Sequence, residues 1–270
     1  MTDDNRHQPP ATLAFHADAY GPATRYRPHS HDDLHFSLVL SGRVAERVGG
    51  VTEIAGPLSV VAKDPGVVHA NDFGVAGARL ARLTLNAGTL DTLLDDTARA
   101  ISWRWTHDPT VAAPFLRLVR RAEGRAASYV RNDPDLLDLL AAFTARPAPA
   151  VRGTPPAWLV AVLSRVREAW TPELTVAGLA AGAGVHPVYL ARCVRRWFQT
   201  GLGEELRRQR LRAAAAAITE PRRTISDVAH AGGYADEPHF NRDFRVAVGV
   251  TPGWYRKLLG RQEYRFRGTT

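Results

Sequence analysis

The feature that most constrains this chain of 270 residues is a degenerate internal repeat near its C-terminus. Residues 175–198 are echoed by residues 224–245. The matching pairs are Thr175/Thr224, Val176/Ile225, Leu179/Val228, Ala180/Ala229 and Gly184/Gly233 and, after an insertion of one residue, Leu190/Phe240, Arg192/Arg242, Val194/Phe244 and Arg195/Arg245. A repeat of this kind indicates two copies of one small structural unit.

Each copy has the pattern of two helices joined by a tight turn. Thr175 and Thr224 precede short apolar runs and can cap the first helix, and Asp236 can cap the second helix of the second copy. An alanine follows at the helix contact, and Gly184 or Gly233 marks the turn. The second helix of each copy carries arginine on its outward face. Two such helix-turn-helix units are the layout of a module that places a helix in the DNA major groove twice.

The distribution of charge supports this interpretation. The net charge is +8, and residues 151–270 hold 19 Lys and Arg against 10 Asp and Glu, whereas residues 1–150 hold 16 against 17. An arginine- and alanine-rich composition can reflect a GC-rich genome, but such a bias would not choose one half of a chain. The basic half therefore predicts an electrostatic surface for DNA phosphates.

The chain divides at residues 146–156, a Pro- and Ala-rich stretch without periodicity that we interpret as an extended linker. Before it, residues 13–86 show short β runs broken by Gly, Pro and Asp, which predicts a small barrel or sandwich in a domain spanning residues 11–105.

A helical connector is predicted over residues 106–145. Apolar stripes at helical spacing run through residues 90–105 and 111–143. These helices either pair two protomers or pack on their own barrel.

Residues 157–262 form the predicted DNA-binding domain. A helix over residues 158–169 opens it, and a continuous helix over residues 203–219 joins the two copies. At 1.5 Å per residue this joining helix is about 25 Å long. It is a stiff spacer that could hold the second helices of the two copies, called the reading helices below, about one duplex turn, roughly 34 Å, apart.

The remaining composition predicts a cytoplasmic protein with no membrane partner. No apolar run approaches the roughly 20 residues that span a bilayer, and the N-terminus is polar. The single cysteine, Cys193, cannot form an internal disulfide, and the helix period turns it toward the core beside Leu190, Val194 and Trp197.

From residue 158 to residue 256 the sequence resembles the DNA-binding domain of AraC/XylS-type transcription regulators. The shared features are Leu174-Thr175, Leu179-Ala180, Leu190-Ala191-Arg192, Arg210-Leu211, Ala214, Ile225, Val228-Ala229, Gly233-Tyr234, His239-Phe240, Arg242, Phe244-Arg245, Gly249-Val250-Thr251-Pro252 and Tyr255-Arg256. The first copy departs from this pattern in one respect: the small side chains of Val188 and Ala191 occupy positions that face the DNA groove. Hydrogen-bond readout there is expected to fall mainly to Arg192.

We predict the DNA-contacting residues from the outward faces of the two second helices. They are Pro187, Val188, Ala191, Arg192, Arg195 and Arg196 in the first copy and Glu237, Pro238, His239, Arg242 and Arg245 in the second. Arg192 can fork to guanine O6 and N7, and Glu237 can accept from cytosine N4. Arg195, Arg196 and Arg245 are predicted phosphate contacts. The alternative interpretation is that both are merely solvated helix faces.

Four histidines of the N-terminal half, His29, His31, His35 and His69, have the spacing of metal ligands. His29 and His31 project to one side if their segment is a strand, and a barrel can bring His69 opposite. Four neutral imidazoles suit a divalent transition metal such as Zn, Ni or Fe. An organic effector, or histidines that only form hydrogen bonds, are the alternatives.

The histidine pattern, with Gly42 and Pro65-Gly66 before His69, also resembles the two motifs of the cupin barrel, a domain common as the sensor half of AraC-type regulators. It departs from metal-binding cupins in placing His35 where they usually have Glu. The effector pocket is predicted at His29, His31, His35, Phe36 and His69, with Phe73 nearby.

The predicted fold class is therefore multidomain, with an N-terminal all-β cupin-like barrel followed by helices and a C-terminal all-α double helix-turn-helix domain. The resemblance implies a one-component, sequence-specific transcription regulator and not an enzyme. Its expected partners are double-stranded promoter DNA, a small-molecule effector, a second copy of the chain and, for an activator, RNA polymerase. The alternatives are a metal-dependent cupin enzyme with an accessory DNA-binding domain, and a barrel that serves only as a dimerisation scaffold.

Overall fold

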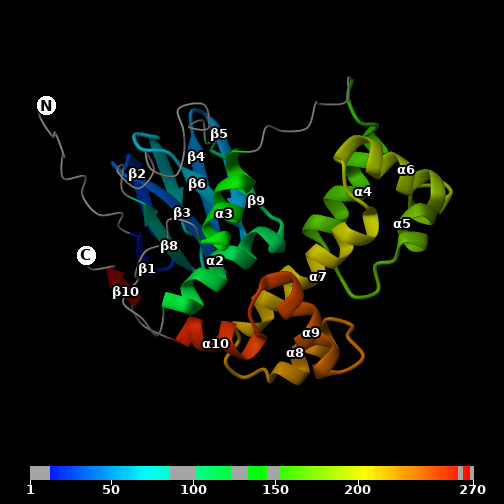
Figure 1. The fold of residues 1–270 in the computed structure, drawn as a ribbon. Helices are drawn as coiled ribbons and strands as arrows, with labels where there is room; N and C mark the ends of the chain where they lie inside the picture. The colour runs from blue at the N-terminus through cyan, green and yellow to red at the C-terminus, as the bar shows by residue number, and fades with distance from the viewer. Residues whose placement is uncertain are drawn as a thin grey trace, which may run out of the picture. The chain divides into compact units, whose positions relative to one another are not determined.

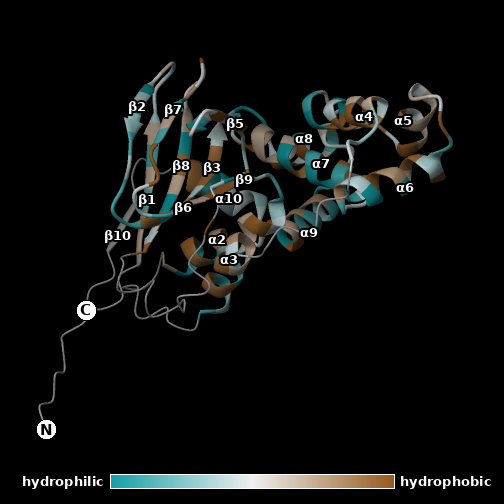
Figure 2. Ribbon diagram, turned by 90° about the horizontal axis from the view of Figure 1, so that it is seen from above, coloured by the Kyte–Doolittle hydropathy of each residue, from teal (hydrophilic) through white to brown (hydrophobic). Residues whose placement is uncertain are grey.

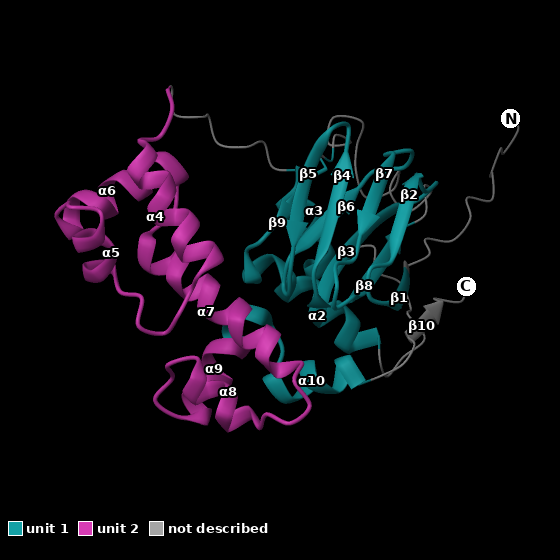
Figure 3. Ribbon diagram, turned by 180° about the vertical axis from the view of Figure 1, so that it is seen from behind, with its two compact units in different colours: residues 1–145, 246–270 teal, residues 146–245 magenta. Residues whose placement is uncertain are grey.

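The computed structural model of the chain describes residues 13–85, 101, 103–122, 133–144, 153–260 and 264–267 (Figure 1). Two compact units result, Met1–Ala145 with Val246–Thr270, and Arg146–Arg245 (Figure 3). The first unit carries the strands, and the described part of the second is helical. The multidomain prediction, β-rich and then helical, is confirmed. The second unit ends inside α9 (Glu237–Val248).

The first unit contains two antiparallel sheets. Their strands are β1 (Leu13–Tyr20), β2 (Arg25–His29), β3 (Leu34–Gly42), β4 (Val44–Val48), β5 (Val51–Ala55), β6 (Val60–Lys63), β7 (His69–Asp72), β8 (Ala78–Leu85), β9 (Trp105–Thr106) and β10 (Tyr264–Arg267). One sheet has the order β10-β1-β8-β3-β6-β9 and the other β2-β7-β4-β5. The hairpin from β4 to β5 turns on Gly49 and Gly50, whose φ angles of 54° and 94° suit glycine.

The two sheets face each other and are called the barrel below; their facing sides are its inner side. An apolar cluster on this inner side joins Val39, Val61 and Leu80 of the larger sheet to Val44 and Phe73 of the smaller one. Because side chains alternate along a strand, the intervening residues of the larger sheet point outward.

Two helices cover the outward side of the larger sheet, α2 (Pro109–Ala122) and α3 (Pro134–Thr144). Phe15 of β1 meets Phe115 of α2 with ring centroids 6.3 Å apart, and Phe36 of β3 meets Phe143 of α3 at 5.6 Å. Many residues of α2, α3 and β3 are hydrophobic (Figure 2). Of the two predicted roles of the helices, packing on their own barrel is therefore the observed one.

The helix predicted up to residue 105 is wrong at its end. Trp105 lies in β9 and pairs with Val61 of β6, because its side chain joins the apolar cluster between the sheets. The other residues of that predicted helix from 90 to 100, and residue 102, lie outside the described part of the chain.

The helix α10 (Pro252–Gly260) also belongs to the first unit. The fully buried Tyr255 donates its hydroxyl hydrogen to the carbonyl oxygen of Leu40 at 2.7 Å. Gly249 precedes the helix with φ +79°, and a Cβ there would lie 2.9 Å from the carbonyl oxygen of Ala113. Glycine therefore permits the close approach of this segment to α2.

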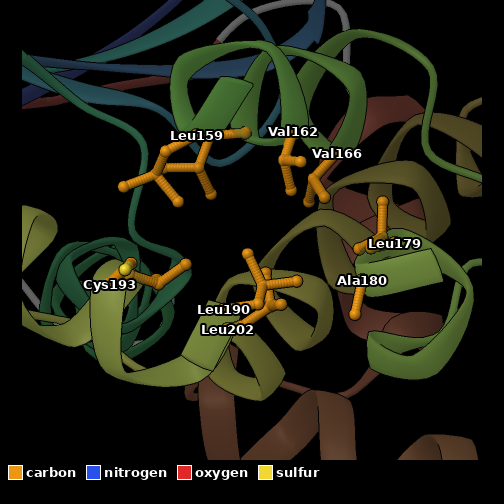
Figure 4. Close-up of a cluster of buried hydrophobic side chains, with 10 residues drawn as sticks. Leu159, Val162, Val166, Leu179, Ala180, Leu190, Cys193 and Leu202 are labelled. Carbon is orange, nitrogen blue, oxygen red and sulfur yellow. The ribbon is translucent and has the colours of Figure 1, made fainter. Parts of the chain in front are cut away.

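The second unit consists of α4 (Ala157–Glu168), α5 (Val176–Gly182), α6 (Pro187–Phe198), α7 (Leu202–Ile218), α8 (Ile225–Ala231) and most of α9. Leu159, Val162 and Val166 of α4 point toward Leu179 of α5 and Leu190 of α6 (Figure 4). Cys193 is a buried free thiol in the same cluster, as predicted. Among the described helices, none is both long and apolar enough to cross a bilayer.

The predicted plan of the two repeat copies is confirmed at its local positions. Thr175 accepts a hydrogen bond from the Gly178 amide at 3.1 Å, and Thr224 accepts from the Asp227 amide at 3.0 Å. Ala180 and Ala229 are fully buried at the helix contact. Gly184 and Gly233 have φ angles of 66° and 70°, so both turns use the left-handed conformation that favours glycine.

The joining helix α7 is ion-paired to both sides of the second unit. Glu205 accepts from Arg167 of α4 at 2.9 Å, while Arg207 donates to Asp243 of α9 at 2.6 Å. Tyr234 completes the second contact by donating to Asp243 at 2.9 Å. These bonds, together with the continuous helix, hold the two copies at a set spacing.

Candidate nucleic-acid interface and histidine cluster

The first reading helix, α6, presents one apolar and one exposed face. Leu190, Cys193 and Val194 are buried against α4 and α5. Pro187 occupies the first turn after His186, whose Nδ1 accepts from the Val188 amide at 3.3 Å. On the other face, Val188, Ala191, Arg192, Arg195 and Arg196 are exposed, and Pro187 is half-buried.

The second reading helix, α9, has the same division. Asp236 accepts from the His239 amide at 2.6 Å, which confirms the predicted cap, and Phe240 and Phe244 are fully buried. Pro238, His239, Arg242 and Arg245 are exposed. Glu237 is half-buried, and its Oε1 accepts a long 3.4 Å hydrogen bond from Asn241.

Two sets of arginines in the second unit differ in their partners. Four of them, Arg167, Arg207, Arg208 and Arg223, pair with a nearby Glu or Asp. The five on the reading helices, Arg192, Arg195, Arg196, Arg242 and Arg245, form no ion pair with a carboxylate of the described residues. Five arginines without a carboxylate partner thus lie on the two faces predicted to meet DNA, where phosphates and guanine acceptors would pair with them.

Tyr189 is an exposed residue of α6 that the sequence pattern did not single out. Its side chain is 52% exposed, and its ring stacks beside that of Trp158 with centroids 6.0 Å apart. It adjoins Val188, which is 56% exposed, so an apolar strip borders Arg192 on this face. The signal in the sequence was an aromatic residue at the edge between the two helix faces.

The four histidines predicted as a cluster do lie together on the inner side of the barrel. His29 ends β2 and pairs with His69 of β7, with ring centroids 4.3 Å apart. His31 follows β2 in a loop rather than a strand, which corrects the expectation that both lie on one strand. The possible ligand nitrogens of His29, His31 and His69 all lie within 4.8 Å of one another.

His35 of β3 lies next to these three histidines but is not one of the residues whose ligand nitrogens lie within 4.8 Å of one another. Its ring centroid lies 4.6 Å from that of His31 and 6.2 Å from that of His69. The residue is 2% exposed, and its Nε2 has no hydrogen-bond partner, which is also true of Nε2 of His31.

Backbone carbonyls orient the histidine rings. Nδ1 of His29 lies 2.8 Å from the carbonyl oxygen of Arg27, and Nδ1 of His69 lies 3.0 Å from that of Val67. Donation from Nδ1 leaves the Nε2 lone pair facing the cluster, which is the arrangement usual for metal-binding histidines.

The surroundings lower the pKa values of His31, His35 and His69. Burial, followed by the charge of Arg82, lowers the pKa of His31 to about 4. Burial, followed by the charge of Lys63, lowers the pKa of His35 to about 2 and that of His69 to about 4. Neutral imidazoles with free Nε2 lone pairs fit a divalent transition metal.

Phe36 does not belong to the predicted pocket. It follows His35 on β3, and the alternation of the strand turns it outward onto Phe143 of α3. Phe73, by contrast, lies on the inner side, where its ring stacks on that of Tyr20 with centroids 3.9 Å apart.

Sequence reasoning missed a buried polar network beside the histidines. Lys63 donates to Glu46, and Glu46 also accepts from Asn71 at 2.9 Å and from Trp103 at 2.8 Å. Burial raises the pKa of Glu46, but the charge and hydrogen bond of Lys63 and the other two donors outweigh it, so that its pKa lies below the ordinary value. The signal was a lysine at the end of the otherwise apolar strand β6.

Two family models match the chain. One, described as an AraC-like ligand binding domain, matches residues 14–138, and the other, described as a helix-turn-helix domain, matches residues 179–258. The first therefore covers β1 to β9, α2 and the start of α3, and the second covers both repeat copies from Leu179 onward.

Curated relatives match about a third of the chain. An AraC-like transcription regulator from Streptomyces lividans is 36% identical over 83 residues, 31% of this chain and 27% of that protein. The transcriptional activator NphR from Rhodococcus is 33% identical over 92 residues, 32% of this chain and 25% of that protein. The regulatory protein SoxS from Salmonella typhimurium is 35% identical over 86 residues, 32% of this chain and 80% of that protein. The match thus spans about a quarter of the first two relatives and most of the third.

Proposed function

Because this chain belongs to the AraC family of transcription regulators, with a ligand-binding N-terminal domain and a helix-turn-helix DNA-binding domain, we propose that α6 and α9 read one bipartite promoter site. The N-terminal domain senses a small molecule or a metal, and its occupancy shifts an existing equilibrium between DNA-binding states.

The observation that carries this proposal is the contrast between paired and unpaired arginines in the second unit. Arg167 and Arg207, which join α7 to α4 and α9, have carboxylate partners, whereas the arginines on the exposed faces of the reading helices have none among the described residues. In this proposal Arg192 and Arg242 read bases, and Arg195, Arg196 and Arg245 contact phosphates. Val188, Ala191 and Pro238 lie close enough on the same faces to touch bases, and His239 and Glu237 add polar groups.

The test is selection of binding sites from a random DNA pool by the purified full-length chain at two salt concentrations. Enrichment of a two-part motif with halves about one helical turn apart is expected. Arg47→Ala, which removes an exposed arginine on the outside of the barrel, is the matched control and should select the same motif. Binding that enriches no sequence and only weakens as salt rises would contradict the proposal.

We propose further that His29, His31 and His69 hold a divalent transition metal, with His35 beside them. Two observations support this: the ligand nitrogens lie close together, and Nε2 of His31 is buried without a partner. When bound, such a metal would supply a Lewis-acidic centre that an oxygen of an effector could coordinate.

Metal analysis of the purified protein tests this part. About one equivalent of metal per chain is expected, lost on His69→Ala and kept on His16→Ala, a histidine of β1 outside the set. Absence of stoichiometric metal after loading, with no change on His29→Ala, would contradict it.

We also propose how the protein acts on transcription and in which state it acts. NphR is an activator by name, which supports activation through contact with RNA polymerase. We propose that the protein acts in the cytoplasm as a homodimer and has no enzymatic activity, since the relatives named above are regulators.

A further inference from the structure

We propose that the inner side of the barrel binds a small hydroxycarboxylate, with Arg82 holding the carboxylate and His35 accepting from the hydroxyl. This inference rests on the proposed function, because it names the class of effector that the N-terminal domain would sense.

Arg82 reaches the inner side from the middle of β8. It pairs with His16 of β1 on one side and with Ser37 of β3 on the other. Its strand neighbours Ala81 and Leu83 are buried on the opposite side, under the covering helices. The alternation of β8 therefore turns an arginine toward the space between the two sheets.

The guanidinium of Arg82 lacks an anionic partner. Its Nε is buried without any hydrogen-bond partner, and its Nη2 makes only a 3.4 Å contact with the hydroxyl of Tyr20. No carboxylate of the described residues forms an ion pair with it. A half-buried charge in this state is costly, and an anionic ligand would compensate it.

A second cation on the inner side, Lys63, already has an anionic partner. Lys63 is paired with Glu46, whose second oxygen is held by Trp103. Arg82, by contrast, forms no ion pair among the described residues and reaches only the Tyr20 hydroxyl, which also bonds the carboxylate of Asp18. A single planar guanidinium fork without an ion pair suits a carboxylate better than a doubly charged phosphate.

His35 supplies an acceptor for a second group of the ligand. Its ring bonds the backbone of Asp33, and its buried Nε2 has no partner. Arg82 pairs with Ser37, two residues along β3 from His35, so the two side chains are diagonal neighbours about 7–8 Å apart at their Cα atoms. A hydroxyl next to a carboxylate fits that span, with each group forming one hydrogen bond of about 2.9 Å.

The rest of the inner side is apolar. Val39 follows Ser37 on the same side of β3, and Phe73 faces it from the smaller sheet. Polar groups therefore gather at one end of the inner side and apolar groups at the other. An aryl or alkyl hydroxycarboxylate matches this division.

Calorimetric titration of the full-length chain with mandelate, phenylacetate and mandelamide tests the proposal. Phenylacetate lacks the hydroxyl and mandelamide lacks the charge. Each should bind about tenfold more weakly than mandelate or worse, because each loses a hydrogen bond to a buried group. The titrations are run on chelator-treated and on zinc-loaded protein, so that coordination by a metal can be separated from binding by Arg82.

Variants assign the two roles. Arg82→Gln should abolish the preference for mandelate over mandelamide. His35→Leu should abolish the preference for mandelate over phenylacetate. Arg47→Gln, which removes an exposed arginine from the outer side of β4, should leave both preferences unchanged. Thermal unfolding of each variant checks that it is folded.

Three outcomes overturn the proposal: no binding of mandelate, equal binding of acid and amide by the wild type, or a preference unchanged in folded Arg82→Gln. Site selection on random DNA is scored separately. Selection of a motif without mandelate binding would support the proposed DNA-binding function and contradict only the hydroxycarboxylate site. Mandelate binding without a selected motif would support the site and contradict the proposed DNA-binding function.

Discussion

The two helix-turn-helix copies share the same backbone arrangement but differ in the side chains of their reading faces and of their cores. Both have a threonine cap, a fully buried alanine and a glycine with positive φ at the turn. Their reading faces diverge, since the first exposes Val188 and Tyr189 beside Arg192 whereas the second exposes His239 beside Arg242. The comparison teaches that the constrained positions are those where backbone geometry leaves no room for substitution.

The cores diverge as well. The first copy packs aliphatic side chains, Leu179, Leu190 and Val194, against α4. In the second copy the rings of Phe240 and Phe244 lie 5.5 Å apart, and that of Tyr234 lies 5.0 Å from Phe240. One backbone plan thus tolerates two kinds of core as long as each fills its volume.

The largest expected effect is on these cores. Phe240→Ala should lower the free energy of unfolding by about 3–5 kcal/mol and Leu190→Ala by about 2–5 kcal/mol, because each leaves a cavity where a fully buried side chain stood. Urea unfolding of the full-length chain measures both. A cost below about 1 kcal/mol for either would mean that its copy rearranges to fill the cavity.

Next in size is the effect on DNA binding. Arg192→Ala and Arg242→Ala should each weaken binding to the selected site by about 1–3 kcal/mol and relax base preference only in the half read by that copy. Titration of the selected site and of random DNA separates the contributions. Equal losses on both DNAs would show that these arginines contact phosphates only.

The helix caps come third. Thr175→Ala and Thr224→Ala should each cost about 1 kcal/mol, because an amide at the start of α5 or α8 loses its acceptor. Thr175→Ser and Thr224→Ser keep the hydroxyl and serve as controls in the same unfolding experiment. Serine variants that lose as much as the alanine variants would show that the methyl group, not the cap, matters.

The smallest expected effect is one of pH, and it separates the copies. Asp227 of the second copy accepts from the Thr224 amide at 2.8 Å, whereas the first copy has Gly178 at that position. The hydrogen bonds of Thr224 hold the pKa of Asp227 below its ordinary value. The stabilisation is therefore present at neutral pH and is lost as the pH falls through that lowered pKa.

A carboxylate titration by NMR measures this shift. In Thr224→Ala the midpoint for Asp227 should rise toward the ordinary aspartate value. An unchanged midpoint would show that the side chain of Thr224 does not contribute to the lowered pKa.

Predictions that depended on neighbouring residues succeeded, and those that depended on distant ones mostly did not. The caps at Thr175, Thr224 and Asp236 were readable because donor and acceptor lie three residues apart. The outward turn of Phe36 was predictable in principle from strand alternation once His35 was placed inward. The Lys63–Glu46 pair could not be predicted, because it depends on which strands of the two sheets face each other.

The histidine cluster shows both sides of this division. Its four members were named from spacing, and the pairing of β2 with β7 brings His29 and His69 together. That His31 lies in a loop and that His35 stands beside the set of three followed from the path of the chain between strands, which spacing does not specify.

Local periodicity and hydrogen bonds between near neighbours made four features readable from the sequence: the double helix-turn-helix, its caps and turns, the exposed faces of α6 and α9, and the identity of the clustered histidines. Three outcomes emerged only from the folded chain: α2 and α3 cover their own barrel, Glu46 neutralises Lys63, and Arg82 forms no ion pair among the described residues. Those outcomes depend on strand register and on charge compensation between sheets, which bring together residues far apart in the chain.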